Sequence, residues 1–297
     1  MGTRNATLSA HVMALATVFV WGITFVSTKV VLERGVTPAE IMLYRFLVAY
    51  LLILPLTFRR ARAENARDEL LFVALGVSGG SFYFIAENVA LQHTLAANVS
   101  VLVCTAPLFT AILSRVFLRE RLARAYWWGS GVALAGVAVV VFNGRFVLRL
   151  DPAGDLLSLA AALSWGFYTI ILRLLDGRYS TLFITRKVFF YGLITLLPVF
   201  HFAPARAGGA LLLSAPVLWN LLFLGVLASF ICYVLWNRAI KRLGAVRASN
   251  YIYINPVITL VASAVVLSER ITPLALAGTL LILGGIYLTG KRRRGPP

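Results

Sequence analysis

The chain has few charged residues, few cysteines and few histidines. Charged side chains make up 13% of its 297 residues, whereas about a quarter of the residues in an ordinary globular domain are charged. The two cysteines, Cys104 and Cys232, lie in apolar runs, and the three histidines are scattered at His11, His93 and His201. We therefore expect no disulfide framework, no metal site and no cofactor, and an ordinary soluble domain is excluded.

Motifs of enzymes and of N-terminal targeting are lacking as well. The chain contains no GxxxxGK[ST] motif, and no HExxH, DxxD or paired-carboxylate pattern. The first apolar run is too long for the core of a signal peptide, and no small-residue cleavage site follows it, so we expect no cleaved leader. The sequence therefore does not predict an ATPase or an enzyme.

Long apolar runs are what the chain does have. Hydrophobic residues make up 60% of it, and they come in runs of roughly 20, the length that crosses about 30 Å of hydrocarbon as a helix. The runs predict ten membrane-spanning helices at 8–32, 39–58, 69–91, 96–118, 124–143, 154–175, 183–202, 216–240, 246–268 and 273–290. The connecting segments are short, so we expect an all-α polytopic membrane protein with a single membrane domain over residues 1–297.

The basic residues are unevenly distributed over the predicted loops. With the N-terminus in the cytoplasm, 19 Lys and Arg residues fall on the cytoplasmic side, 5 fall outside and 4 lie within spans. This asymmetry satisfies the positive-inside rule and predicts cytoplasmic N- and C-termini in a cell membrane, and we expect a bacterial inner membrane. The net charge of +17 thus reflects topology, and nucleic-acid binding is not expected.

One stretch occurs twice. Residues 96–121 read AANVSVLVCTAPLFTAILSRVFLRER, and residues 245–270 read AVRASNYIYINPVITLVASAVVLSER. An offset of 149 residues places Pro107 on Pro256. Each proline removes a backbone donor near the middle of its span, so both predict a broken helix. We interpret the breaks as hinges, although a fixed kink that only improves packing is the simpler alternative.

The duplication extends over the whole chain. Trp21 in the first span has a counterpart at Trp165 in the sixth, which divides the chain into repeat one (8–143) and repeat two (154–290). Five crossings per repeat force the second copy to enter from the opposite side, so the repeats have inverted topology. Such repeats are typical of secondary transporters. The alternative is a duplicated scaffold without a transport role.

The joint pattern resembles a known family. Residues 90–122 (ALQHTLAANVSVLVCTAPLFTAILSRVFLRERL) and 239–288 (AIKRLGAVRASNYIYINPVITLVASAVVLSERITPLALAGTLLILGGIYL) resemble the drug/metabolite transporter superfamily. Within it they are similar to the ten-helix EamA-type exporters, in particular to bacterial exporters of aromatic amino acids. The resemblance implies a basket in which spans one, three, four, six, eight and nine line a central cavity. The chain lacks the paired Lys/Arg cluster of phosphate-ester exchangers in spans nine and ten, so a phosphorylated substrate is not expected.

Candidate substrate contacts are the polar and aromatic residues of those six spans. Amphipathic rings and amides suit an amphipathic solute, although a single ring near a span end can simply belong to an interfacial belt. The candidates are Trp21, Tyr83, Asn88, Asn98, Ser100, Trp165, Tyr168, Tyr233, Trp236, Asn237, Asn250, Tyr251 and Asn255.

Glu87 is expected to be the only acidic residue inside a span, near the outer end of span three. A carboxylate within a membrane is costly and therefore a functional candidate. Glu87 could bind a substrate amino group, carry a coupling proton, or merely pair with Lys29 or Arg45. These alternatives stay open at the level of sequence.

The sequence favours a secondary transporter that exports small amphipathic metabolites as a monomer or homodimer, and we expect aromatic or hydrophobic amino acids as its substrates. An intramembrane lipid-modifying enzyme, a passive channel and a subunit of a larger complex are the alternatives. Glycines in spans five and ten permit close helix contact, either between these spans or between two copies of the chain.

Overall fold

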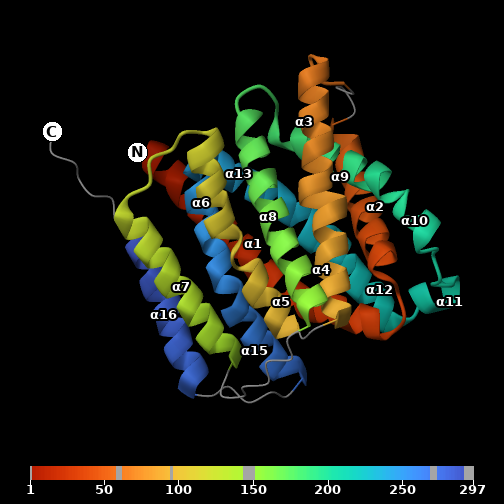
Figure 1. The fold of residues 1–297 in the computed structure, drawn as a ribbon. Helices are drawn as coiled ribbons and strands as arrows, with labels where there is room; N and C mark the ends of the chain where they lie inside the picture. The colour runs from red at the N-terminus through yellow and green to blue at the C-terminus, as the bar shows by residue number, and fades with distance from the viewer. Residues whose placement is uncertain (1, 58–61, 94–95, 143–150, 268–272, 291–297) are drawn as a thin grey trace.

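The computed structural model describes residues 2–57, 62–93, 96–142, 151–267 and 273–290, and all regular structure in these ranges is helical (Figure 1). The helices pack side by side as one bundle. In the described residues, seven helical stretches are long and apolar enough to cross a membrane. The protein is therefore an all-α polytopic membrane protein.

Each predicted span corresponds to one helix or to a stack of shorter helices. The first five spans are α1 (Gly2–Glu33); α2 (Pro38–Thr57); α3 (Ala66–Gly76), η1 (Val77–Ser81) and α4 (Phe82–His93); α5 (Ala96–Val103) and α6 (Ala106–Phe117); and α7 (Arg124–Phe142). The last five are α8 (Pro152–Leu174); α9 (Thr181–Leu196) and α10 (Val199–Phe202); α12 (Ala215–Leu222), η2 (Phe223–Ile231) and α13 (Cys232–Leu243); α14 (Ala245–Ser249), η3 (Asn250–Ile254) and α15 (Asn255–Leu267); and α16 (Pro273–Gly290), with the short α11 (Gly209–Leu212) before α12. Apart from the start of α1, the boundaries lie within three residues of the predicted ones.

The two ends of the bundle can be told apart by contacts between distant segments. We call the end where α1 begins and α16 ends the terminal face, and the other end the far face (Figure 1). His93, at the end of α4, lies 3.5 Å from Asp151, the cap of α8. Beyond the other end of α8, Arg178 pairs with Asp68 at the start of α3. The helix α8, which is span six, therefore runs from the far face to the terminal face, opposite to α1. The repeats are inverted as predicted.

Spans three and eight contain irregular turns that the sequence pattern does not predict. Both are interrupted by a π-helical segment, η1 in the first repeat and η2 in the second. In η1, Gly80 has non-helical dihedral angles (φ −132°, ψ −105°). A Cβ atom added to Gly79 would lie 2.2 Å from the Tyr168 ring. Glycine is thus needed there because an aromatic side chain of the other repeat packs against the bare backbone.

Spans five and ten pack against each other within one chain. A Cβ atom on Gly285 would lie 2.4 Å from the backbone nitrogen of Ala133, and one on Gly136 would lie 2.6 Å from that of Ile282. Small residues therefore let the backbones of α7 and α16 touch. Of the two alternatives that the sequence left open, the contact between spans five and ten within one chain is therefore present.

The expectation that Glu87 is the only acid inside a span is wrong. Glu40 and Asp68 are fully buried at the starts of α2 and α3. Glu40 accepts hydrogen bonds from the backbone nitrogens of Arg206 and Ala207, each at 2.7 Å. Asn65 caps α3 by accepting from the nitrogen of Asp68 at 2.8 Å. The helix α3 begins before its apolar run because this cap satisfies a donor of its first turn.

Candidate functional site

A central pocket lies among the helices of both repeats, and the space between its lining atoms, open solvent included, is about 440 Å³. It is lined by Trp21, Thr24, Phe25, Arg45, Tyr83, Phe84, Glu87, Val103, Ala106, Trp165, Tyr233, Ile252 and Asn255. All six spans that the resemblance places around a cavity contribute, and α2 adds Arg45. Arg45 lies seven residues from the far-face start of α2, and Glu87 six from the far-face end of α4, so the pocket occupies the half of the bundle toward the far face.

Aromatic rings form much of the pocket wall. Trp21 and Trp165, the pair matched between the repeats, meet edge to face with ring centroids 5.2 Å apart. Tyr83 lies 5.0 Å from the Trp165 ring. Trp21 is held in place because its Nε1 donates to the carbonyl of Ala228 at 2.9 Å. The wall is thus a fixed apolar surface suited to a ring or an aliphatic chain.

One cation and one anion face this wall. The Arg45 guanidinium lies over the Phe84 ring, 4.0 Å from its centroid, and its Nε donates to Ser229 Oγ at 3.0 Å. The Glu87 carboxylate accepts from the Tyr83 hydroxyl at 3.3 Å. Both charged side chains are buried, with exposures of 2% and 7%. Of the two cations considered beside Glu87, Lys29 instead donates to the carbonyl of Leu91 at 2.8 Å.

Two polar atoms of the lining residues have no partner within the described structure. They are Nε1 of Trp165, a donor, and Oδ1 of Asn255, an acceptor. The two residues are each 4% exposed. A buried polar atom without a partner costs free energy, so these two atoms are candidates for hydrogen bonds to a water molecule or a ligand.

A polar layer closes the pocket on the side of the terminal face. The Tyr168 hydroxyl donates to Asn237 Oδ1 at 2.5 Å, and Asn237 Nδ2 donates to Thr185 Oγ1 at 2.9 Å. Tyr233 donates to the carbonyl of Gly79, and Trp236 is completely buried against Trp21. Three of the predicted contact residues do not line the pocket but belong to this layer on its terminal-face side. They are Tyr168, Trp236 and Asn237.

The other predicted contact residues lie elsewhere in the bundle. Asn88 donates to the carbonyl of Pro38 at 3.2 Å, Tyr251 is hydrogen-bonded to His11 at 2.5 Å, and Asn250 donates to Thr289 at 2.9 Å. Ser100 is buried without a partner for its hydroxyl. Asn98 is part of α5, but its side chain lies outside the described residues. The pocket thus contains Trp21, Tyr83, Glu87, Trp165, Tyr233 and Asn255 from the predicted set.

Both helices that carry the paired prolines are interrupted, as predicted. In span four, α5 ends at Val103 and α6 begins at Ala106, just before Pro107. In span nine a 3₁₀ turn, Asn250–Ile254, precedes α15, whose second residue is Pro256. Pro256 removes the α-helical donor of the Ile252 carbonyl. This carbonyl accepts instead from the backbone nitrogen of Asn255 in the 3₁₀ turn and from Cys104 Sγ at 3.3 Å. The two breaks therefore contact each other.

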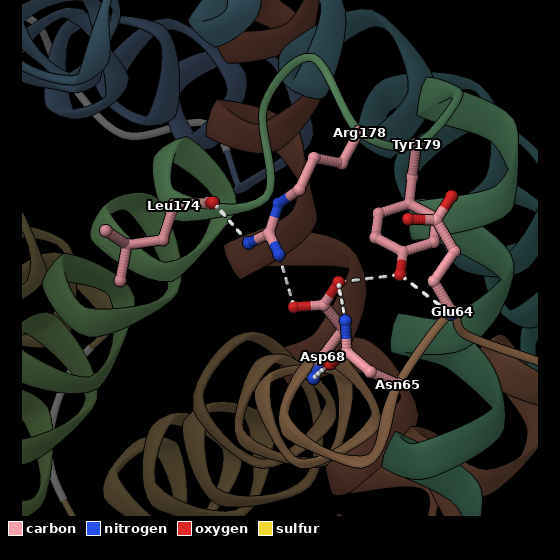
Figure 2. Close-up of polar contacts among 6 residues, drawn as sticks. All are labelled: Glu64, Asn65, Asp68, Leu174, Arg178 and Tyr179. Atoms are coloured by element: carbon pink, nitrogen blue, oxygen red, sulfur yellow. Dashed lines mark hydrogen bonds and ion pairs between the residues drawn. The ribbon is translucent and has the colours of Figure 1, made fainter.

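A cluster of charged residues ties the repeats together at the terminal face (Figure 2). The carboxylate of Asp68 in α3 pairs with Arg178 and accepts from the Tyr179 hydroxyl at 2.7 Å. Arg178 also donates to the carbonyl of Leu174 at 2.7 Å, and Tyr179 accepts from the nitrogen of Glu64 at 3.0 Å. Burial raises the pKa of Tyr179, so this phenol stays protonated and remains a donor to Asp68. We call these residues the Asp68 cluster.

A second ionic contact lies beside the Asp68 cluster. Lys187 in α9 pairs with Glu69 in α3, and Tyr191 donates to the same carboxylate. Arg186 donates to the carbonyl of Thr57 at 2.5 Å. Both basic residues are buried, with exposures of 5% and 6%. Both residues of α9 thus bind partners in the first repeat, so specific polar contacts join the two repeats near the terminal face.

The sequence matches the model of the EamA-like transporter family twice, over residues 8–142 and 152–291. These two matches include the helices that line the pocket. The chain belongs to the EamA-like transporter family. This EamA-family protein is accordingly a multi-pass membrane transporter of small molecules and not an enzyme.

Several named relatives are similar over nearly their whole length. The EamA-family protein is 33% identical over 293 residues to a "Probable terminal-alkyne amino-acid exporter" of Streptantibioticus cattleyicolor, covering 97% of this chain and 96% of the relative. It is 29% identical over 287 residues to a "Probable amino-acid metabolite efflux pump" of Escherichia coli (strain K12), covering 93% of each. A solved crystal structure, 19% identical, matches with a TM-score of 0.73 over 97% of this chain and 96% of that one, which supports the same fold.

Arg45 is the main pocket residue that the sequence analysis did not list among the substrate contacts, because it considered Arg45 only as a possible partner of Glu87. Its signal is a full charge seven residues inside an apolar helix, at a position where lipid exposure would be costly. Apolar lining residues such as Phe25, Phe84 and Val103 give no such signal, because pocket and core positions look alike in an apolar sequence.

Proposed function

We propose that this EamA-family protein exports small amphipathic amino acids, aromatic or hydrophobic ones above all, through the central pocket. The observation that carries the proposal is the presence of Arg45 and Glu87 in one pocket with an aromatic wall. An amino acid at neutral pH has a carboxylate, an ammonium group and a side chain. The pocket offers one complementary element to each.

The charges fit this class of substrate better than an ion or an uncharged lipid. The guanidinium of Arg45 is a planar donor that matches a carboxylate, and the carboxylate of Glu87 matches an ammonium group. Both residues are buried. A ligand with a single charge pairs with only one of them and leaves the other buried charge without a new partner, which is costly. The unpartnered Trp165 Nε1 and Asn255 Oδ1 supply a further donor and acceptor.

The names of two relatives are consistent with this substrate class. One is described as an amino-acid exporter and the other as an amino-acid metabolite efflux pump. These descriptions concern those proteins, and they support amino acids as the first compounds to test here.

For the mechanism we propose alternating access within a single membrane domain of two inverted repeats. The Asp68 cluster and the Tyr168–Asn237–Thr185 layer separate the pocket from the terminal face. In the other state these contacts would part, and the broken spans four and nine would bend at Pro107 and Pro256. Inverted repeats make such an exchange of conformations possible, because each repeat can adopt the shape of the other.

We further propose that the terminal face is cytoplasmic, because most loop Lys and Arg residues lie at that end. Cysteine substitutions at two exposed positions, Arg62 near the terminal face and Arg206 near the far face, test the orientation. A membrane-impermeant maleimide should label Arg206→Cys in intact cells and Arg62→Cys only after permeabilisation. The native Cys104 and Cys232 are buried, and the reverse labelling pattern would show that the orientation is wrong.

The function is tested in proteoliposomes with labelled phenylalanine, tryptophan and leucine, driven by an imposed substrate gradient. We expect uptake above that of empty liposomes. Phenethylamine, which lacks the carboxylate, and 3-phenylpropionate, which lacks the ammonium group, should compete at least about tenfold more weakly than phenylalanine, because each leaves one charged partner unpaired. Uptake no faster than in empty liposomes would refute the proposal.

A further inference from the structure

A second, smaller pocket lies at the terminal face. It is formed by the terminal-face ends of α8, α9 and α13, and the space between its lining atoms, open solvent included, is about 240 Å³. It is lined by Leu172, Arg173, Asp176, Thr181, Ile184, Asn237, Ile240 and Lys241. We call it the terminal pocket.

The terminal pocket also contains charges of both signs. Asp176 accepts from Arg173 at 2.7 Å, and Lys241 Nζ lies 3.5 Å from the other oxygen of the same carboxylate. The Lys241 side chain is 43% exposed and that of Asp176 24%. Such partly exposed ion pairs are weak and exchange partners easily. A zwitterion can therefore insert its two charged groups among them.

Only one layer of side chains separates the terminal pocket from the central pocket. On α13, Tyr233 lines the central pocket, and Asn237, four residues later, lines the terminal pocket. On α8, Trp165 lines the central pocket, and Leu172, seven residues later, lines the terminal pocket. At 1.5 Å per residue these separations are about 6 and 10 Å along the helices.

Asn237 connects the two pockets. Its amide accepts from Tyr168, which packs against Trp165 with centroids 4.9 Å apart, and donates to Thr185. The hydrogen bonds that close the central pocket thus include a lining residue of the terminal pocket. A ligand polar group reaching Asn237 from the terminal face competes directly for these hydrogen bonds.

We infer that the terminal pocket is a loading site that holds the charged head of the amino acid before the Tyr168–Asn237–Thr185 layer opens. The substrate carboxylate contacts Lys241 and Arg173, and its ammonium group contacts Asp176. This inference rests on the proposed function. It adds a second substrate site, used only from the terminal face.

The test compares Lys241→Gln and Asp176→Asn with Arg238→Gln, an exposed cation on α13 that does not line the terminal pocket. Transport of labelled phenylalanine is measured in vesicles of both orientations, with substrate applied to either face. We expect the first two variants to raise KM at the terminal face about three- to fivefold, the scale of a partly exposed charge contact. In these two variants KM at the far face and kcat should equal the wild-type values. The Arg238→Gln variant should have the wild-type KM at both faces.

The outcomes distinguish failure of the loading site from failure of the proposed function. If the wild type transports phenylalanine and both variants keep its terminal-face KM, the loading site is refuted while the proposed function stands. An equal rise in KM at both faces also refutes it, because the charges would then act on the whole protein. If the wild type does not transport any amino acid tested, the proposed function and the loading site fall together.

Discussion

Arg45 and Lys29 are two cations in the far-face half of the bundle with different surroundings. Arg45 lines the central pocket, whereas Lys29 binds the carbonyl of Leu91. If Arg45 binds the substrate carboxylate, Arg45→Gln should raise KM for phenylalanine about tenfold or more, since a buried charge contact is lost. Lys29→Gln should change KM less than about twofold. Equal effects in proteoliposome assays, with both variants folded by melting temperature, would contradict a specific role for Arg45.

Glu87 can be tested separately from Arg45. The two functional roles considered for Glu87, binding a substrate ammonium group and carrying a coupling proton, predict different effects of the same substitution. As a partner of the substrate ammonium group, Glu87→Gln should raise KM about tenfold and leave the pH dependence of transport intact. As the carrier of a coupling proton, the same change should abolish the pH dependence. Rates measured at a series of pH values, with phenethylamine and phenylalanine as competitors, separate these roles. A Glu87→Gln variant with wild-type KM would remove Glu87 from the binding site.

At the level of helices, neighbouring glycines in α16 provide a matched test of close packing. A Cβ atom on Gly285 would meet the backbone of α7 at 2.4 Å, whereas no atom lies within 4 Å of one on Gly284. We expect Gly285→Ala to destabilise the protein by about 1–3 kcal/mol through overpacking. Gly284→Ala should be neutral or slightly stabilising, since alanine favours helix. Melting temperatures in detergent check this, and equal melting temperatures would mean that the α7–α16 contact is adjustable.

The two proline breaks make a second prediction at the same scale. If spans four and nine bend during transport, Pro107→Ala and Pro256→Ala should each lower kcat several-fold with little change in KM, because the ground-state pocket is not altered. If the breaks only improve packing, kcat should be preserved and the melting temperature should change instead. Measuring both quantities for both variants distinguishes a hinge from a fixed kink. Unchanged kcat in both variants would remove the hinge.

Helix order and breaks differ in how far they can be predicted from sequence. The ten spans and the prolines at Pro107 and Pro256 are visible because apolar length and a missing donor are local properties. The π-helical segments η1 and η2 are not visible, since they depend on contacts such as Tyr168 against Gly79.

The residues of the pocket can likewise be predicted from the sequence only in part. Trp21 and Trp165 stand out by their symmetry, but Arg45 joins them only through tertiary packing.

At the scale of the whole molecule, the Asp68 cluster joins the first repeat to the loop between α8 and α9 (Figure 2). Under the proposed alternating access it stabilises the state that is closed at the terminal face. Asp68→Asn removes the charge that binds Arg178 and should shift the population toward the opposite state. Loss of one such charged hydrogen bond, about 1–3 kcal/mol, shifts the ratio of the two states by a factor of roughly 5 to 150.

The shift can be measured with a cysteine placed in the wall of the terminal pocket. Ile184 is 4% exposed and lines that pocket, so Ile184→Cys should react slowly with a maleimide added at the terminal face. In the Asp68→Asn background we expect labelling to accelerate, and phenylalanine binding measured from the far face to weaken. Arg67→Gln, which changes an exposed charge next to Asp68, serves as the control because it leaves the cluster intact. Faster labelling without weaker far-face binding would indicate local loosening of α3, and an unchanged labelling rate would show that the cluster does not hold the terminal face closed.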